Sequence, residues 1–156
     1  MRAFDLIVFA THGVVSGETS AIAPGLVLTP PQVATLNDDG LLTAAEVAGL
    51  SMSARLVILS ACNTAAGNNM NDEGLSGLAS GFFHAGAQSL MVTHWAVYSD
   101  ASAQISANIS KRVAEDNALP VARALRRVVT DILADPRASR RSKHPAYWAP
   151  FTIVGL

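Results

Sequence analysis

Four short stretches of the chain are predominantly apolar and have the length of single strands. They are residues 5–10, 55–60, 88–93 and 151–154. Apolar runs of this length are typical of strands that are buried on both faces, as in a parallel sheet covered by helices. The pattern therefore predicts four strands of one mostly parallel sheet.

Three amphipathic segments lie between or after these strands, and their apolar residues recur at helical spacing. We predict helices over residues 74–85, 99–115 and 120–133, with Ser99 or Asp100 as the N-cap of the second helix. Strands that alternate with helices indicate an α/β fold in which helices cover both faces of the sheet. Neither a repeat nor a linker is visible, so we predict one domain.

The first two predicted strands are separated by a segment rich in Gly, Pro, Ser, Asn and Asp. Residues 14–42 have this composition and predict a long loop, in which residues 26–28 are the candidate for a short strand. A loop of this length inside a compact domain is usually functional or mobile. Thr43 and Glu46 then have the spacing of a capping box, which predicts the start of a short helix.

The composition is that of a folded domain with a large core. Half of the residues are hydrophobic, 15% are charged, and the formal net charge is −1. This charge gives no reason to expect nucleic acid or an anionic membrane as a partner. Basic residues do cluster between Arg123 and Lys143. We expect a solvated face there, with a partner-docking surface as the alternative.

The expected location is the cytosol. No apolar run approaches the roughly 18 residues of a membrane span, and the first residues become acidic too early for a signal peptide. Cys62 is the single cysteine, so an intrachain disulfide is impossible. A lone thiol stays reduced in the cytosol.

Reactive side chains follow three of the predicted strands. His12 ends the first strand, Cys62 follows the second, and His94 follows the third. In open α/β sheets, sites form outside the carboxyl ends of the strands, where neighbouring parallel strands meet at one rim. A thiol and an imidazole that meet at this rim are a plausible nucleophile and base.

The spacing of the histidine and the cysteine sharpens this hypothesis. His12 precedes Cys62 by about 50 residues, the separation seen in caspases. Gly13 has no side chain, so its backbone N–H can approach a substrate carbonyl closely. Together with the N–H of Cys62, it would form an oxyanion hole.

The order and spacing of several motifs resemble the CHAT domain family, a caspase-related module often found beside tetratricopeptide repeats. The resemblance extends along essentially the whole chain. The matching motifs occupy residues 10–13, 41–47, 56–64, 73–78, 86–90 and 144–151.

The resemblance implies a caspase-like three-layer sandwich that hydrolyses peptide bonds through a thioacyl-enzyme. It assigns Cys62 as nucleophile and His12 as its partner, with a protein or peptide as substrate and tetratricopeptide repeats in the parent protein. Members of the family carry a further section before the histidine strand. We therefore expect residues 1–156 to be a single domain that corresponds to the C-terminal catalytic part of a larger protein and lacks its N-terminal strand or strands.

The chain departs from the family in the segment after the third predicted strand. Family members usually have Leu-Trp-Pro-Val followed by acidic residues, and this segment helps to form the pocket for the residue before the scissile bond. Here residues 94–100 are His-Trp-Ala-Val-Tyr-Ser-Asp. We predict substrate contacts from four residues of this segment: His94, Trp95, Tyr98 and Asp100.

Two other interpretations of the function remain open at this point. The same fold would serve as an inactive interaction or scaffold domain, or as an enzyme for a small acyl substrate. Zinc is disfavoured because the four histidines and one cysteine form neither a helical i, i+4 pair nor a Cys-x-x-Cys motif. A serine hydrolase is disfavoured because Ser60 and Ser89 lack a Gly-x-Ser-x-Gly elbow. No cofactor is expected.

Overall fold

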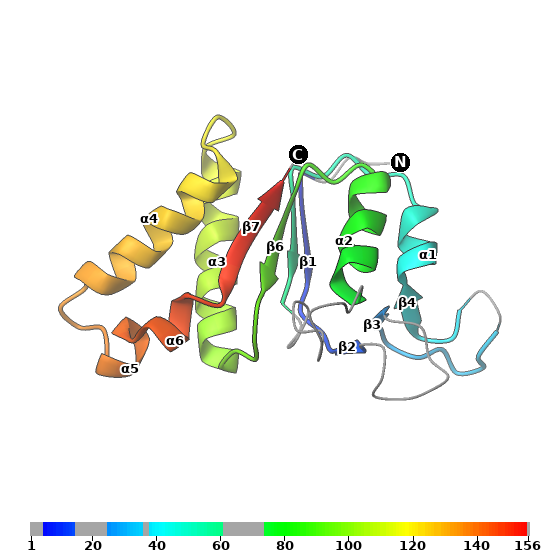
Figure 1. Ribbon diagram of the computed structural model, residues 1–156, viewed down its shortest axis with the longest axis horizontal. Coiled ribbons are helices and arrows are strands. Elements are labelled where there is room, and N and C mark those ends of the chain that lie inside the picture. The colour runs from blue at the N-terminus through cyan, green and yellow to red at the C-terminus, as the bar shows by residue number, and fades with distance from the viewer. Residues whose placement is uncertain (1–4, 15–24, 36–37, 61–73, 156) are drawn as a thin grey trace.

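The computed structural model describes residues 5–14, 25–35, 38–60 and 74–155. In these residues a central sheet lies between two sets of helices (Figure 1). The elements in chain order are β1 (Leu6–Phe9), β2 (Gly13–Val14), β3 (Gly25–Val27), β4 (Leu41–Thr43), α1 (Ala44–Ala48), β5 (Leu56–Leu59), α2 (Gly74–His84), β6 (Ser89–Thr93), α3 (Ser99–Glu115), α4 (Val121–Ala134), α5 (Arg140–Lys143), α6 (Pro145–Trp148) and β7 (Phe151–Gly155).

The main sheet has the strand order β1-β5-β6-β7. β1, β5 and β6 run parallel, with Leu6 opposite Leu56, whereas β7 pairs antiparallel with β6. The predicted α/β fold with a mostly parallel sheet is confirmed, and all four predicted strands are present. The parallel strands end at the lower edge of Figure 1, which we call the rim.

The two faces of the sheet carry separate hydrophobic cores, because successive residues of a strand point to opposite faces. Leu56 and Ile58 of β5 pack with Ile105 and Val128 on the side of α3 and α4. Val57 and Leu59 belong to the other core, which includes α1 and α2. All four residues of β5 are buried, as the continuous apolar run predicts.

A second, three-stranded sheet with the order β2-β3-β4 lies in the segment that we predicted as a long loop. The prediction of one short strand near residues 26–28 is close to β3, but the prediction of loop for β2 and β4 is wrong. These strands have two or three residues, too few for a periodic pattern. Leu26 is fully buried and joins this small sheet to the core beneath α1 and α2.

The helix boundaries follow the predictions with one correction. The capping box of Thr43 and Glu46 is present at the start of α1. The prediction that Ser99 or Asp100 caps α3 is wrong: both lie in its first turn, and the N-cap is Tyr98, whose side chain makes no capping hydrogen bond. Among the helices described, none has the length and apolar content needed to span a bilayer.

Candidate active site

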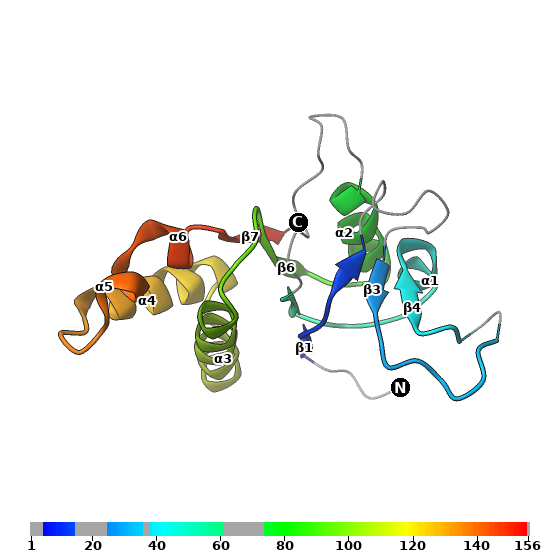
Figure 2. The same cartoon turned by 90° about the horizontal axis from the view of Figure 1, so that it is seen from below.

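The ends of β1 and β5 bring His12 and Ser60 to the same rim of the sheet, the edge that Figure 2 views from below. The N–H of Ser60 donates a 2.9 Å hydrogen bond to the carbonyl of Phe9, which continues the parallel pairing by one residue. His12 and Ser60 both line a pocket of about 290 Å³. Cys62, the predicted nucleophile, lies two residues beyond Ser60 in sequence and outside the described residues.

The backbone of His12 is held by the small sheet. The N–H of Val27 donates a 2.8 Å hydrogen bond to the carbonyl of His12, and the hydroxyl of Thr11 donates to the carbonyl of Val27. The imidazole itself is exposed. The backbone of His12 is thus held in place while its ring is accessible to solvent. A catalytic base needs such access in order to reach a substrate.

The orientation of the Gly13 amide follows from the same pairing. Antiparallel strands alternate between hydrogen-bonded and non-hydrogen-bonded residue pairs. Val27 bonds to His12, so the next pair, Gly13 with Leu26, is non-hydrogen-bonded. The N–H of Gly13 therefore points away from β3, on the outer side of a strand that forms the edge of its sheet.

The pocket beside His12, which we call the serine pocket, combines apolar walls with hydroxyl groups. Ten described residues line it: Val8, Ala10, Thr11, His12, Ser60, Val97, Ser99, Ser102, Ala103 and Ser106. The hydroxyls of Ser60 and Ser102 share a hydrogen bond, whereas Ser106 Oγ is buried with no hydrogen-bond partner among the described residues.

Two serines of this pocket, Ser102 and Ser106, were not predicted from the sequence. Ser102 and Ser106 are each 8% exposed and lie one turn apart on α3. A usable signal was present, since they flank Ile105 on the buried stripe of an amphipathic helix. Polar residues at such positions need a structural or functional explanation.

The segment after β6 places His94 and Trp95 at the protein surface. Trp95 is 45% exposed, and its ring centroid lies 6.4 Å from that of His94. The N–H of His94 donates a 3.0 Å hydrogen bond to the carbonyl of Pro150, which extends the pairing of β6 with β7. Neither side chain lines the serine pocket.

Tyr98 and Asp100 are engaged by Arg141 from α5. The guanidinium carbon of Arg141 lies 4.1 Å from the ring centroid of Tyr98, and its Nη2 lies 3.5 Å from Asp100 Oδ1. Burial, and secondarily the charge of Asp100, raise the pKa of the nearby Tyr147 hydroxyl. Asp100 is thus part of an ion pair, and the described lining of the serine pocket contains no carboxylate.

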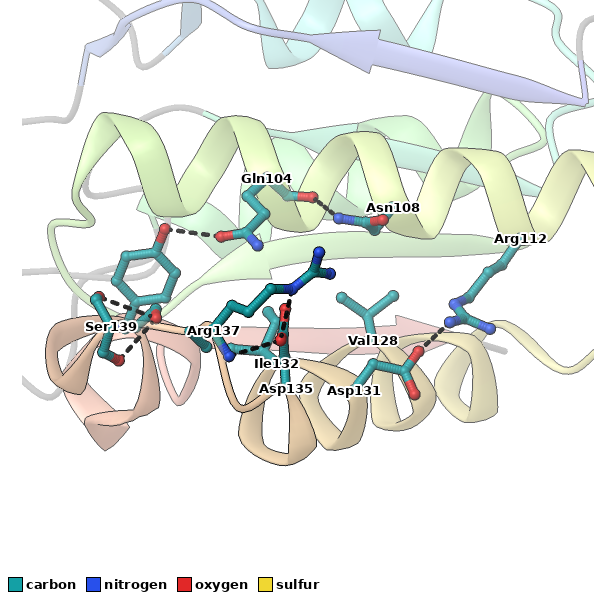
Figure 3. Close-up of a pocket in the computed structure, with 12 residues that line it drawn as sticks. Gln104, Asn108, Arg112, Val128, Asp131, Ile132, Asp135, Arg137 and Ser139 are labelled. Atoms are coloured by element: carbon teal, nitrogen blue, oxygen red, sulfur yellow. Dashed lines mark hydrogen bonds and ion pairs between the residues drawn. The ribbon is translucent and has the colours of Figure 1, made fainter.

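A larger hollow of about 460 Å³ lies between α3 and the segment formed by α4 and α5 (Figure 3). Its charged groups are paired within the protein: Arg112 with Asp131 and Arg137 with Asp135. The N–H of Arg137 also lowers the pKa of the Asp135 carboxyl. His12 does not line this hollow. The carboxylates of the hollow are engaged in ion pairs with Arg112 and Arg137, so we do not assign the hollow a catalytic nucleophile or base.

The side chains that could bind a metal ion are scattered over the part of the chain that the structure describes. Within the described ranges, no group of three or more His, Cys, Asp or Glu side chains is arranged to hold a metal ion. The chemistry that the described rim supports is therefore that of His12, backbone amides and serine hydroxyls.

The sequence matches a known protein family and is similar to a known protein. The family model for the CHAT domain matches residues 1–156, the whole chain. The chain is also similar to mouse tetratricopeptide repeat protein 28, with 34% identity over 116 residues. That match covers 74% of this chain but only 4% of the relative, so this chain corresponds to a small part of that protein.

Proposed function

This chain belongs to the CHAT domain family, a caspase-like family, and we propose that it is a cysteine endopeptidase that cleaves a protein or peptide through Cys62 and His12. One observation carries the proposal. β1, which ends three residues before His12, pairs in parallel with β5, which leads to Cys62. Ser60, two residues before the cysteine, lines the same pocket as His12. Thiol and imidazole on neighbouring strand ends form the nucleophile and base of such enzymes.

The proposed reaction has two steps. His12 takes the proton of the Cys62 thiol, and the sulfur attacks the carbonyl carbon of the scissile peptide bond. The amides of Gly13 and Cys62 donate hydrogen bonds to the oxyanion, and His12 then protonates the leaving amine. In the second step, water activated by His12 attacks the thioester, releases the carboxylic acid and restores the thiol. The direction of the Gly13 N–H, away from β3, supports its part in this scheme.

The exposed segment after β6 is proposed to contact the substrate on the surface. Trp95 offers a large apolar face, and His94 offers a hydrogen-bonding ring beside it. Tyr98 and Asp100 are proposed to act through Arg141, which holds the segment against α5. The chain itself is proposed to be one domain of a larger protein that contains tetratricopeptide repeats, as the name of the mouse relative suggests. Its proposed location is the cytosol, where Cys62 stays reduced.

A second function is favoured by a different observation. Val8, on the edge strand β1, is 44% exposed, and it lines one hollow together with Val27 and Leu28, which are 36% and 40% exposed. Exposed apolar side chains beside a strand edge are typical of surfaces that bind another polypeptide. An inactive CHAT domain would use such a surface as a scaffold. The two functions separate in a Cys62→Ala variant, which loses peptide cleavage in the first case and keeps its biological effect in the second.

The decisive measurement is the alkylation rate of Cys62 by iodoacetamide from about pH 5 to 9. Cys62 is the single cysteine, so the label reports one site. An unperturbed thiol with a pKa of about 8.5 reacts slowly at pH 6. We expect rapid labelling at pH 6 that is lost in His12→Ala and kept in the control His94→Ala, which removes another exposed histidine. Slow labelling that His12→Ala leaves unchanged would contradict the proposal.

A further inference from the structure

The serine pocket has a buried floor made of hydroxyl groups from two elements. Ser102 and Ser106 of α3 are more than nine-tenths buried, and Ser60 reaches the same pocket from the end of β5. The Ser60–Ser102 hydrogen bond joins the strand that leads to the proposed nucleophile to helix α3. The pocket is therefore attached directly to the proposed catalytic rim.

Ser106 supplies the observation that points to a ligand. A serine inside a helix can satisfy its hydroxyl by bonding to the carbonyl four residues earlier. Ser106 Oγ does not, and it has no other partner among the described residues although it is buried. A buried hydroxyl without a partner lowers stability and needs an explanation. A ligand group that enters the pocket and forms a hydrogen bond with Ser106 Oγ would explain why this hydroxyl is buried without a partner among the described residues.

The remaining lining defines which chemistry fits. Val8, Ala10, Val97 and Ala103 contribute apolar surface, and His12 at the proposed catalytic centre is the one titratable group among the described lining residues. The carboxylate of Asp100, next to Ser99 in sequence, is paired with Arg141. The volume of about 290 Å³ accommodates one side chain.

We propose that the serine pocket receives the substrate side chain that precedes the scissile bond, and that it selects an uncharged side chain ending in a carboxamide, glutamine or asparagine. This inference rests on the proposed peptidase function. A carboxamide has both donors and an acceptor, which serine hydroxyls match because each can donate and accept. Its methylene stem fits the apolar walls.

Charged side chains are excluded by the same lining. An arginine or lysine in this pocket would lose its hydration without meeting a carboxylate. An aspartate or glutamate would meet only His12, which the proposed reaction already pairs with the sulfur of Cys62. Leaving a buried charge unpaired is more costly than leaving a neutral amide partly unpaired.

The test is a peptide library that varies the residue before the cleaved bond. We expect the wild type to prefer glutamine or asparagine by about tenfold over arginine and aspartate. Ser106→Ala should remove most of that preference without lowering the melting temperature, since it removes an unpartnered hydroxyl. The matched control is Ser110→Ala, on the same helix but outside the pocket, and it should keep the preference.

A second variant should reverse the selectivity. Ser99 is exposed, lines the pocket mouth and lies in the first turn of α3, where an added carboxylate is favourable to the helix. We expect Ser99→Asp to raise cleavage after arginine or lysine by about tenfold. An equal effect of Asn108→Asp, at an exposed position of the same helix outside the pocket, would contradict the placement of the subsite.

A binding measurement separates this inference from the proposed catalysis. Product peptides that end in glutamine, asparagine, arginine or aspartate are titrated against Cys62→Ala, which binds without reacting. Tighter binding of the amide-ended peptides, weakened by Ser106→Ala, supports the pocket even if the wild type cleaves nothing. Cleavage or binding that favours a charged residue, or that ignores Ser106, overturns the pocket assignment and leaves the peptidase proposal intact.

Discussion

The N–H of Val27 donates a 2.8 Å hydrogen bond to the carbonyl oxygen of His12. This bond extends the pairing of β2 with β3 by one residue, to His12, which lies three residues after the end of β1 in the main sheet. The carbonyl of His12 and the amide of Gly13 belong to one planar peptide group, so this bond fixes the direction of both. The small sheet therefore has a specific role, which is to hold the backbone of the proposed base at the rim.

Val27→Pro tests this role, because proline has no N–H to donate to the carbonyl of His12. We expect the His12-dependent alkylation of Cys62 at pH 6 to fall by about tenfold or more, since small displacements of a catalytic group have large effects. Leu28→Pro is the control, because the N–H of Leu28 bonds to Gly40 rather than to His12. Equal losses in both variants would indicate general damage to the small sheet.

Two glycines near α2 should respond to alanine in opposite directions. Gly86 has φ +108°, and a Cβ there would overlap the carbonyl oxygen of Met52. Gly86→Ala should therefore lower the free energy of unfolding by about 2–4 kcal/mol. Gly77 is exposed inside α2 with open space around it, so Gly77→Ala should raise it by about 0.5–1 kcal/mol. Urea unfolding measures both, and changes of the same sign would contradict the argument.

The sequence predicts the main sheet well because each of its strands is a run of buried apolar residues. The run at residues 55–60 contains β5, whose four residues are all buried. The stripe of Val121, Val128 and Ile132 likewise lies in the core as α4. Each of these patterns is local, so the sequence alone contains the whole signal.

Other features depend on contacts between distant segments and have no local signal. The contact between Asp100 and Arg141 joins residues that are 41 positions apart. β2, which pairs with β3, has only two residues, too few to show an alternation of apolar and polar side chains. The serine pocket is formed by β1, β5 and α3 together, so that Ser106 acquires its significance only when the three elements are in place.

The contact of Arg141 with Asp100 is expected to contribute little to stability. Both side chains are more than half exposed, and exposed ion pairs and cation–π contacts each stabilise by about 1 kcal/mol or less. We expect Arg141→Gln to lower the free energy of unfolding by about 1 kcal/mol at low salt, and by less at about 1 M salt, where charges are screened. Arg140→Gln, on the same helix, is the control. A loss that salt does not reduce would mean that the contact is apolar in origin.

Tyr147 should give the protein a pH dependence in the alkaline range. Its side chain is 4% exposed, and its hydroxyl donates a 3.0 Å hydrogen bond to Gln104 Oε1. Burial raises the pKa of Tyr147 above the ordinary value of 10.0, so the folded state keeps the proton at a pH where the unfolded chain begins to lose it. The stability that this provides is fully present below pH 10 and is lost as the pH rises through the folded-state pKa.

Tyr147→Phe isolates that effect. At neutral pH we expect the variant to lose about 1 kcal/mol through the missing hydrogen bond. Above pH 10 the difference from the wild type should shrink, because phenylalanine has no proton to lose and the wild type becomes less stable. Urea unfolding from neutral to alkaline pH measures this difference, with Tyr98→Phe as the control because Tyr98 is about half exposed. A constant difference across that range would show that Tyr147 ionises alike in both states, and that its burial does not hold the proton.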